Sequence, residues 1–252
     1  MKTYGIIPSR FGSSRFPGKP LAILAGKPLV AWVVEAVKKA TSLDEVFVAT
    51  DDERIVKAVE ACGGKAVMTP SELPSGTDRI ACAARTFAGG DFADDDILVN
   101  IQGDEPLIDP KLVDELAGKL KDSSAFDMAT AVTPIKSIQD YEAKTVVKVV
   151  MARDDSALYF SRAPIPCDRD HEIDLESGLY VRHLGLYAYR GAFLKRYIAT
   201  PPCALEKTEK LEQLRALWMG AKIAIVRTED EGVGVDTPED AERVAKILAE
   251  RA

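Results

Sequence analysis

The sequence predicts an α/β fold with a mostly parallel central sheet, helices on both faces and a smaller antiparallel extension in the second half. Two observations support this prediction. Short β-rich runs alternate with amphipathic helical runs along most of the 252 residues, a pattern typical of largely parallel sheets. In the second half, several strand-like runs follow one another without regular helices between them, which favours antiparallel pairing.

The first half alternates strands and helices in a regular way. We expect strands at residues 4–8, 45–50, 65–68 and 97–101, the last buried on both faces because it is continuously apolar. We expect helices at 28–40, 53–62 and 78–87. Gly63 and Gly64 end the second helix, since glycine readily adopts the left-handed conformation that follows many helices.

The second half is expected to form the antiparallel extension and then return to the α/β pattern. The expected strands are 128–132, 145–151, 158–160, 184–189 and 222–227, and the expected helices are 191–198, 205–219 and 237–252. The last helix has a clear start, because Thr237 can cap it, Pro238 suits its first position and Asp240 completes a capping box. We expect residues 1–252 to form one domain.

Composition excludes several classes of protein. The net charge of −7 argues against a general nucleic-acid binder. No apolar run approaches the roughly 18–20 residues that span a bilayer, and residues 1–8 lack the apolar stretch of a signal peptide. The four cysteines are widely separated and there are only two histidines, which disfavours disulfides and structural zinc and favours a reducing cytoplasm.

A basic loop follows the first strand. Arg10, Arg15 and Lys19 occur there with Gly12 and Gly18, at the place where α/β sheets bind ligands. Glycines allow backbone N–H groups to approach phosphate oxygens, and the cations add positive charge. The loop departs from the Walker pattern in spacing and lacks its final hydroxyl residue. It is therefore either a new form of phosphate-binding loop or a solvated basic loop.

Two carboxylates are expected at the ends of strands. Asp104 follows the buried strand 97–101, and Asp236 precedes the last helix, where Thr237 already serves as the cap. Mg²⁺ is commonly held by one or two carboxylates together with phosphate oxygens, so both are candidate metal ligands. The alternatives are an ordinary acidic turn before Pro106 for Asp104, and a second helix cap for Asp236.

Polar residues elsewhere could contact a nucleotide base or a second substrate. The segment 75–79, SGTDR, opens a helix with exposed N–H groups, although an ordinary capped helix looks similar. Arg162, His183 and Tyr187 lie on otherwise apolar strands of the second half. Glu212 and Gln213 interrupt the apolar stripe of the helix 205–219, where Glu212 could simply pair with a nearby arginine. Each alone fits a structural role about as well as a functional one.

Taken in order, nine segments resemble the 3-deoxy-manno-octulosonate cytidylyltransferases, the CMP-Kdo synthetases. The resemblance runs from Ile6 almost to the C-terminus. The segments are IPSR at 7–10, RFPGKPL at 15–21, ATD at 49–51, SGTDR at 75–79, QGDEP at 102–106, ALYFSR at 157–162, RHLG at 182–185, LEQLR at 211–215 and VDTPED at 235–240.

The resemblance implies a nucleotide-diphospho-sugar transferase fold, CTP and Kdo as substrates, Mg²⁺ as cofactor, and a homodimer formed through second-half strands. It also implies that roughly residues 155–205 are the substrate and dimerisation extension. It implies attack of the sugar's anomeric hydroxyl on the α-phosphorus of CTP, and we expect two Mg²⁺ ions and the basic loop to offset the repulsion between the two anions. The implied roles are triphosphate binding by Arg10, Arg15 and Lys19, cytidine binding by Ser75, Gly76, Thr77 and Arg79, metal binding by Asp104 and Asp236, and sugar binding by Gln102, Arg162, His183, Tyr187, Glu212 and Gln213.

Other functions compete with this interpretation. Relatives that act on 8-amino-Kdo share almost every motif, and CMP-sialic acid synthetases share mainly the front half. A non-catalytic nucleotide-binding module would have little reason to keep both carboxylates with three loop cations. A dinucleotide-dependent oxidoreductase would need the GxGxxG fingerprint, which the chain lacks.

Overall fold

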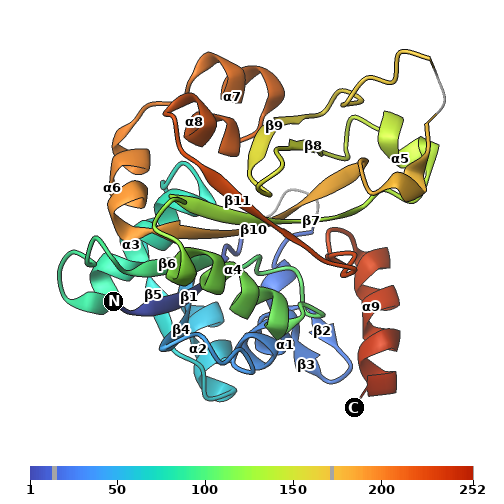
Figure 1. Ribbon diagram of the computed structural model, residues 1–252. Helices are drawn as coiled ribbons and strands as arrows, with labels where there is room; N and C mark the ends of the chain where they lie inside the picture. Colours follow the sequence, from blue (N-terminus) through green and yellow to red (C-terminus); the bar gives the residue numbers. More distant parts are fainter. Residues whose placement is uncertain (13–15, 171–172, 252) are drawn as a thin grey trace.

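One large sheet organises the part of the chain that the computed structural model describes, residues 1–12, 16–170 and 173–251. Its main strands are β1 (Thr3–Ser9), β4 (Glu45–Thr50), β5 (Ala66–Met68), β6 (Ile97–Asn100), β7 (Met128–Pro134), β10 (Val181–Arg190) and β11 (Ile223–Arg227). They lie in the order β11-β7-β10-β6-β1-β4-β5 (Figure 1). The expected strands are therefore present, and they share one sheet.

The sheet is mostly parallel, as predicted. β1 pairs in parallel with β4 and β6, β4 with β5, and β11 with β7. β10 runs antiparallel between β6 and β7. This arrangement differs from one expectation, because the runs at 128–132 and 184–189 belong to the central sheet and not to a separate extension. The reason is the length of β10, whose ten residues reach from the extension into the centre.

The antiparallel extension is smaller than the central sheet. It consists of β8 (Lys148–Met151) and β9 (Ala157–Ser161), with β8 paired to the first residues of β10. The short helix α5 (Ile138–Glu142) lies beside it at the upper right of Figure 1. The extension is thus anchored on the same strand that later passes through the central sheet.

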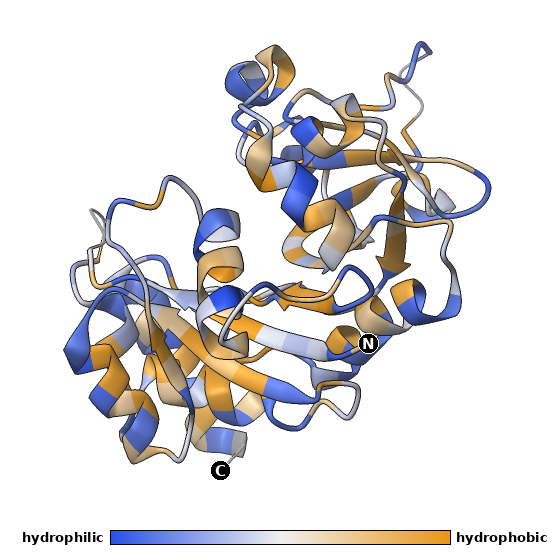
Figure 2. Cartoon of the chain, turned by 90° about the vertical axis from the view of Figure 1, so that its left-hand side faces the viewer, coloured by the Kyte–Doolittle hydropathy of each residue, from blue (hydrophilic) through white to orange (hydrophobic). Residues whose placement is uncertain are grey.

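Helices cover both faces of the sheet. They include α1 (Leu29–Val37), α2 (Glu53–Ala61), α3 (Gly76–Ala88), α4 (Pro110–Asp122) and α6 (Gly191–Ala199). Along β1, Ile6 belongs to the core beneath α3 and α6, and its neighbour Ile7 to the core beneath α1, α2 and α4. This alternation follows from the two-residue period of a strand, and it explains why apolar residues predominate on the central strands (Figure 2).

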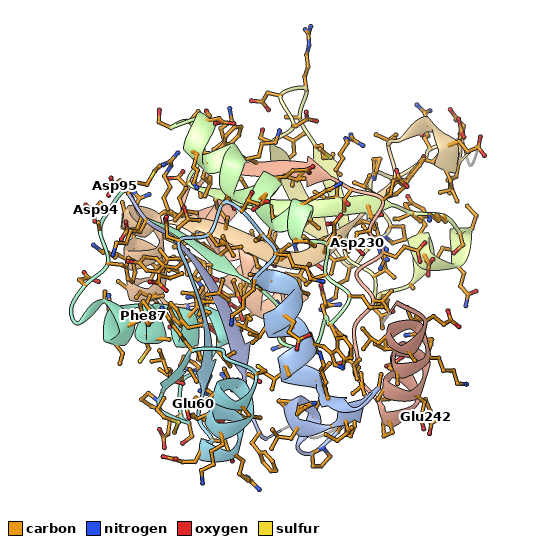
Figure 3. All side chains as sticks on the ribbon, turned by 90° about the horizontal axis from the view of Figure 1, so that it is seen from below. Glu60, Phe87, Asp94, Asp95, Asp230 and Glu242 are labelled. Atoms are coloured by element: carbon orange, nitrogen blue, oxygen red, sulfur yellow. The ribbon has the colours of Figure 1, made fainter. Side chains whose placement is uncertain are left out.

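Charged side chains lie on the outside of these layers. Figure 3 shows Glu60 on α2, Asp94 and Asp95 before β6, and Glu242 on the last helix pointing away from the sheet. Within the described ranges, no helix combines the length and apolar character needed to cross a membrane.

The last helix, α9 (Pro238–Arg251), packs against the N-terminal part of the chain. Val244 and Leu248 share a small core with Leu24 and Leu29, which lie beside the hairpin of β2 (Ile23–Leu24) and β3 (Lys27–Pro28). The predicted capping box is confirmed, because the Asp240 N–H donates to Thr237 Oγ1 and the Thr237 N–H donates to Asp240 Oδ2, both at 3.2 Å. The packing of α9 brings the segment before it to the basic loop.

The expected helix 205–219 is two helices, which corrects the prediction. α7 (Ala204–Glu209) ends at Lys210, which adopts the left-handed conformation with φ of 55°, and α8 (Gln213–Trp218) follows. Arg215 ties the two together by donating two hydrogen bonds to the buried carboxylate of Glu206, at 2.6 and 2.7 Å. The break at Lys210 sets Glu212 and Gln213 at the turn between the helices.

A glycine at the end of β10 tests this architecture. A Cβ on Gly191 would lie 2.0 Å from the backbone oxygen of Ala93, whereas a Cβ on Gly118, within α4, would meet nothing within 4 Å. We expect Gly191→Ala to lower the free energy of unfolding by about 3 kcal/mol or more, because backbone would have to move. The control Gly118→Ala should raise it by about 0.5–1 kcal/mol. Chemical denaturation measures both, and similar stabilities would contradict this packing.

Candidate active site

A cavity of about 340 Å³ opens where β1 and β6 end, beside β10 and the turn before α8. Its walls come from five separate stretches of the chain, as expected for a ligand site at the carboxyl ends of parallel strands. The lining residues are Pro8, Gly76, Thr77, Asn100, Gln102, His183, Gly185, Tyr187, Lys210, Leu211, Glu212 and Gln213. Most residues expected to bind the sugar therefore share one pocket with part of the segment expected to bind the base.

The side chains of this pocket are held by hydrogen bonds to one another. The Thr77 hydroxyl donates to Glu212 Oε2 at 2.9 Å, which joins α3 to the turn before α8. Burial raises the pKa of Glu212. The Tyr187 hydroxyl donates to Gln213 Oε1 at 3.2 Å. The polar groups are thus ordered before any ligand arrives, which reduces the cost of binding.

Two buried polar atoms of the pocket have no hydrogen-bond partner among the described residues. They are Asn100 Oδ1 and Gln213 Nε2, on side chains that are only 4% and 3% exposed. Buried polar atoms are nearly always paired, so these two favour a polar ligand. Asn100 is not among the predicted site residues, although an asparagine inside the apolar run 97–101 is a signal that could have identified it.

The two strand-end carboxylates converge beside this pocket. The Lys19 ammonium, on a short 3₁₀ helix (Lys19–Leu21), donates to Asp104 Oδ2 at 2.7 Å and to Asp236 Oδ1 at 3.3 Å. A backbone hydrogen bond of 2.9 Å from the Val235 N–H to the Asp104 oxygen joins the same two segments. The expected meeting of these carboxylates is therefore observed, and their role as metal ligands stays a prediction.

The chemistry of this acidic pair fits Mg²⁺. Carboxylate oxygens are hard ligands, and Mg²⁺ is usually bound by one or two of them together with substrate phosphates. The described part of the chain contains no group of three or more histidine, cysteine or acidic residues arranged to hold a metal. The pair would therefore need phosphate oxygens to complete the coordination. Nearby, burial and the Asp104 charge raise the pKa of Glu105 to about 7.

Besides Lys19, Asp104 and Asp236, four predicted residues that the structure describes lie apart from the pocket lining. Arg79 is fully buried, and its guanidinium donates to Asp51 Oδ2 at 3.1 Å and to the Thr69 hydroxyl. Arg162 donates to the backbone oxygens of residues 144 and 209. Their contacts in the fold are thus structural, and their proposed ligand contacts stay predictions.

The other two lie near the entrance to the site. Arg10 donates to the Leu73 oxygen at 2.9 Å, which places its cation beside the segment that precedes α3. Ser75 caps α3, because its hydroxyl accepts a hydrogen bond from the Asp78 N–H. Arg15 lies outside the described residues.

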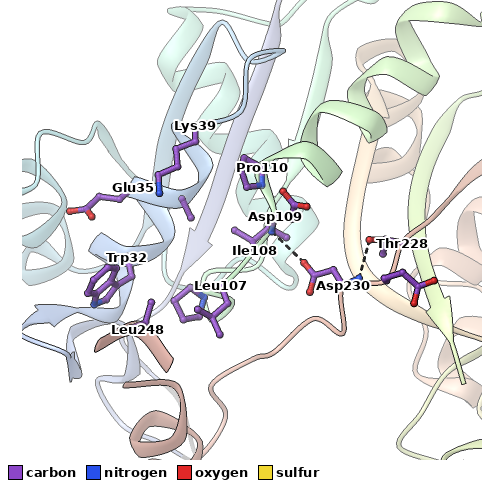
Figure 4. Close-up of a pocket in the computed structure, with 13 residues that line it drawn as sticks. Trp32, Glu35, Lys39, Leu107, Ile108, Asp109, Pro110, Thr228, Asp230 and Leu248 are labelled. Atoms are coloured by element: carbon purple, nitrogen blue, oxygen red, sulfur yellow. Dashed lines mark hydrogen bonds between the residues drawn. The ribbon is translucent and has the colours of Figure 1, made fainter. Parts of the chain in front are cut away.

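A second cavity, of about 530 Å³, lies between α1, the start of α4 and α9 (Figure 4). Trp32, Lys39 and Leu248 border it, and on the opposite wall the Asp109 N–H donates to Asp230 Oδ2 at 3.3 Å. None of the predicted site residues lines this cavity. The second cavity is the larger of the two. The smaller pocket is nevertheless favoured as the ligand site, because it lies at the strand ends and contains ordered polar groups.

The chain is similar to known proteins over most of its length. A family model described as Cytidylyltransferase matches residues 4–223. The chain is 50% identical to the 3-deoxy-manno-octulosonate cytidylyltransferase of Bdellovibrio bacteriovorus, over 99% of this chain and 98% of that protein. It is 47% identical to the enzyme of the same name from Geotalea daltonii, over the full length of both.

A solved structure gives the same result. The structure of a CMP:2-keto-3-deoxy-manno-octonic acid synthetase complexed with CTP superposes with a TM-score of 0.91, at 40% identity and with complete coverage of both chains. The expected fold is thereby confirmed. The chain belongs to the 3-deoxy-manno-octulosonate cytidylyltransferase family.

Proposed function

We propose that this protein activates the sugar acid 3-deoxy-D-manno-octulosonate (Kdo) for lipopolysaccharide biosynthesis, by the reaction CTP + Kdo → CMP-Kdo + pyrophosphate. The anomeric hydroxyl oxygen of the sugar bonds to the α-phosphorus of CTP, and the bond from that phosphorus to pyrophosphate breaks. The observation that carries the proposal is the Asp104–Lys19–Asp236 cluster beside a pocket of ordered polar side chains. The names and full-length identity of the relatives support it.

The main obstacle to this reaction is electrostatic, because a sugar carboxylate must approach a triphosphate. Lys19 and Arg10 stand at the end of β1, where they would bind the triphosphate and neutralise part of its charge. Arg15 belongs to the same loop in sequence and is proposed to act with them. Cations fixed in advance stabilise the charge that develops on leaving pyrophosphate without reorganising during the reaction.

Asp104 and Asp236 would hold Mg²⁺ together with phosphate oxygens of CTP. When bound, Mg²⁺ would supply positive charge to the reacting phosphate and lower the pKa of the attacking hydroxyl. The Lys19 ammonium pairs with both carboxylates. Lys19 is therefore proposed to keep them in place for the metal and to turn towards the triphosphate when CTP binds.

The polar pocket would orient the sugar. Gln102, His183, Tyr187, Glu212 and Gln213 border it and offer both donors and acceptors to a molecule rich in hydroxyl groups. Thr77 and Gly76, at the start of α3, would line the adjoining space for cytidine. Fixing the hydroxyl next to the α-phosphorus supplies much of the catalysis in such transfers, because positioning replaces a bimolecular encounter.

We further propose a homodimer formed through the second-half strands and a cytoplasmic location. Leu158 on β9 and Leu179 before β10 are 58% and 52% exposed, and a partner would cover them. The four cysteines are free thiols, in keeping with a reducing compartment.

The substrate is tested by measuring pyrophosphate release from CTP and Mg²⁺ with Kdo, its 8-amino analogue and N-acetylneuraminate. We expect the highest kcat/KM with Kdo. A higher value with the 8-amino analogue or with N-acetylneuraminate would reassign the sugar. A protein that only binds nucleotide would release no pyrophosphate with any of the three.

Replacing a metal carboxylate should abolish most turnover. We expect Asp236→Asn to lower kcat by about 10²–10³-fold and to shift the Mg²⁺ dependence to higher concentration, because the neutral amide is a poorer ligand. Glu231→Gln is the control, since this exposed carboxylate pairs with Lys136 outside the cluster. Near-normal turnover of Asp236→Ala with unchanged Mg²⁺ dependence would refute the proposed metal role.

Removing the loop cation should also reduce catalysis. We expect Lys19→Gln to lower kcat by about 10²–10³-fold, the usual cost of losing one preorganised electrostatic group. Lys39→Gln, on the exposed rim of the second cavity, is the matched control and should retain kcat. Steady-state kinetics at saturating CTP and Mg²⁺ measures both, and equal activities would exclude an electrostatic role for Lys19.

A further inference from the structure

β10 contains an irregularity at the wall of the active-site pocket. Leu184 pairs with Ala131 of β7, but the next paired residue is Tyr187, opposite Thr130. Gly185 and Leu186 therefore have no partner in β7 at this point. A bulge of this kind frees backbone carbonyls from the ladder and redirects side chains, and such bulges often occur beside active sites.

The freed carbonyls orient side chains from other strands. The Gly185 oxygen accepts a hydrogen bond of 2.6 Å from Gln102 Nε2. This contact fixes the amide of Gln102, because its nitrogen is committed to the bulge. The carbonyl oxygen of Gln102 remains to accept from a ligand, and Gln102 borders the pocket.

Thr130 makes the second set of contacts with the bulge. This residue is fully buried, and its Oγ1 lies 2.7 Å from the Leu186 oxygen and 2.9 Å from Nε2 of His183. It also lies 3.3 Å from the Leu184 oxygen. A hydroxyl has one hydrogen, and a carbonyl can only accept. The hydrogen is therefore directed to the Leu186 oxygen, and the hydroxyl accepts a hydrogen bond from His183 Nε2–H.

This arrangement determines the tautomer of His183. Burial lowers the pKa of His183 to about 3, so the imidazole is neutral near pH 7 and carries one N–H. The flanking rings are Phe160 and Tyr187, each with its centroid 5.2 Å from the imidazole centroid. With the hydrogen on Nε2, the lone pair is on Nδ1, which makes no hydrogen bond to any described residue.

We propose that Thr130 is a positioning residue that holds His183 in the Nε2–H tautomer, so that Nδ1 accepts a hydrogen bond from a hydroxyl of the sugar substrate. The inference rests on the proposed function and specifies how its sugar subsite recognises a hydroxyl. The bulge of β10 thereby presents two acceptors, Nδ1 of His183 and the carbonyl oxygen of Gln102. A substrate that offers hydroxyl hydrogens at both points is matched, and one that lacks them is not.

Kinetics of three variants tests the role of the hydroxyl. Thr130→Val keeps the shape of the side chain but removes the acceptor, so we expect KM for Kdo to rise about ten-fold, with kcat and KM for CTP within about two-fold. Thr130→Ser should restore KM for Kdo. Thr133→Val is the matched control, because Thr133 is equally buried on the same strand and its hydroxyl has no partner among the described residues.

The tautomer itself is measured by ¹⁵N NMR of the imidazole nitrogens in the full-length protein without substrate. The chain has two histidines, so a His171→Gln background leaves the signal of His183 alone. We expect a protonated Nε2 and an unprotonated Nδ1, and a change in this pattern in Thr130→Val that Thr130→Ser does not show. Protonation at Nδ1 in the otherwise unchanged protein overturns the proposal even if Thr130→Val does not fold.

The two measurements also separate this inference from the proposed function. The tautomer is observed without any sugar, so an inactive protein with protonated Nε2 would contradict only the assignment of Kdo. An active enzyme whose KM for Kdo is unchanged in Thr130→Val would contradict only the role of Thr130.

Discussion

The site depends on one electrostatic constraint, which is that two carboxylates from distant parts of the chain occupy the same crevice. Like charges so close together repel each other strongly at the reduced dielectric of a protein surface. The Lys19 ammonium lies between them, at 2.7 Å from Asp104 and 3.3 Å from Asp236, and removes this repulsion. The packing of α9 on the N-terminal hairpin holds the segment of Asp236 in reach. The C-terminal helix therefore helps to place Asp236 beside Lys19 and Asp104, although the helix is distant from Asp104 in the sequence (Figure 1).

A second constraint is the reversed direction of β10. Because this strand runs antiparallel between β6 and β7, it passes the end of β6 where Asn100 and Gln102 lie, and its own side chains His183 and Tyr187 border the same pocket. A parallel strand in this position would have needed a crossover connection and would have presented its carboxyl end instead. The reversed strand thus forms one wall of the polar pocket, and its bulge supplies carbonyls that orient the polar groups.

Features that depend on neighbouring residues in the sequence could be predicted. The capping box at Thr237, the buried strand at 97–101 and the strand-end position of Asp104 each follow from neighbouring residues, and the structure has them. Tertiary contacts decided the rest. At the helix break, Lys210 adopts a left-handed backbone conformation, which is unfavourable for lysine and which no local sequence signal predicts. The break occurs together with the Thr77–Glu212 and Glu206–Arg215 contacts. Such contacts join residues that no periodicity relates.

The two halves of the site also differ in electrostatic character, and this difference follows from the chemistry of two anionic substrates. The charged groups lie on strand-end loops, whereas the pocket interior contains amides, a phenol and a neutral imidazole beside one carboxylate. Among the described residues that line the pocket, Lys210 carries the positive charge. Its side chain is exposed, so solvent weakens its electric field. A strongly cationic sugar pocket would compete with the loop for the triphosphate. Under the proposed function, a pocket of oriented polar groups would instead recognise hydroxyls and would leave the strongest positive field for the phosphates, where charge changes during the reaction.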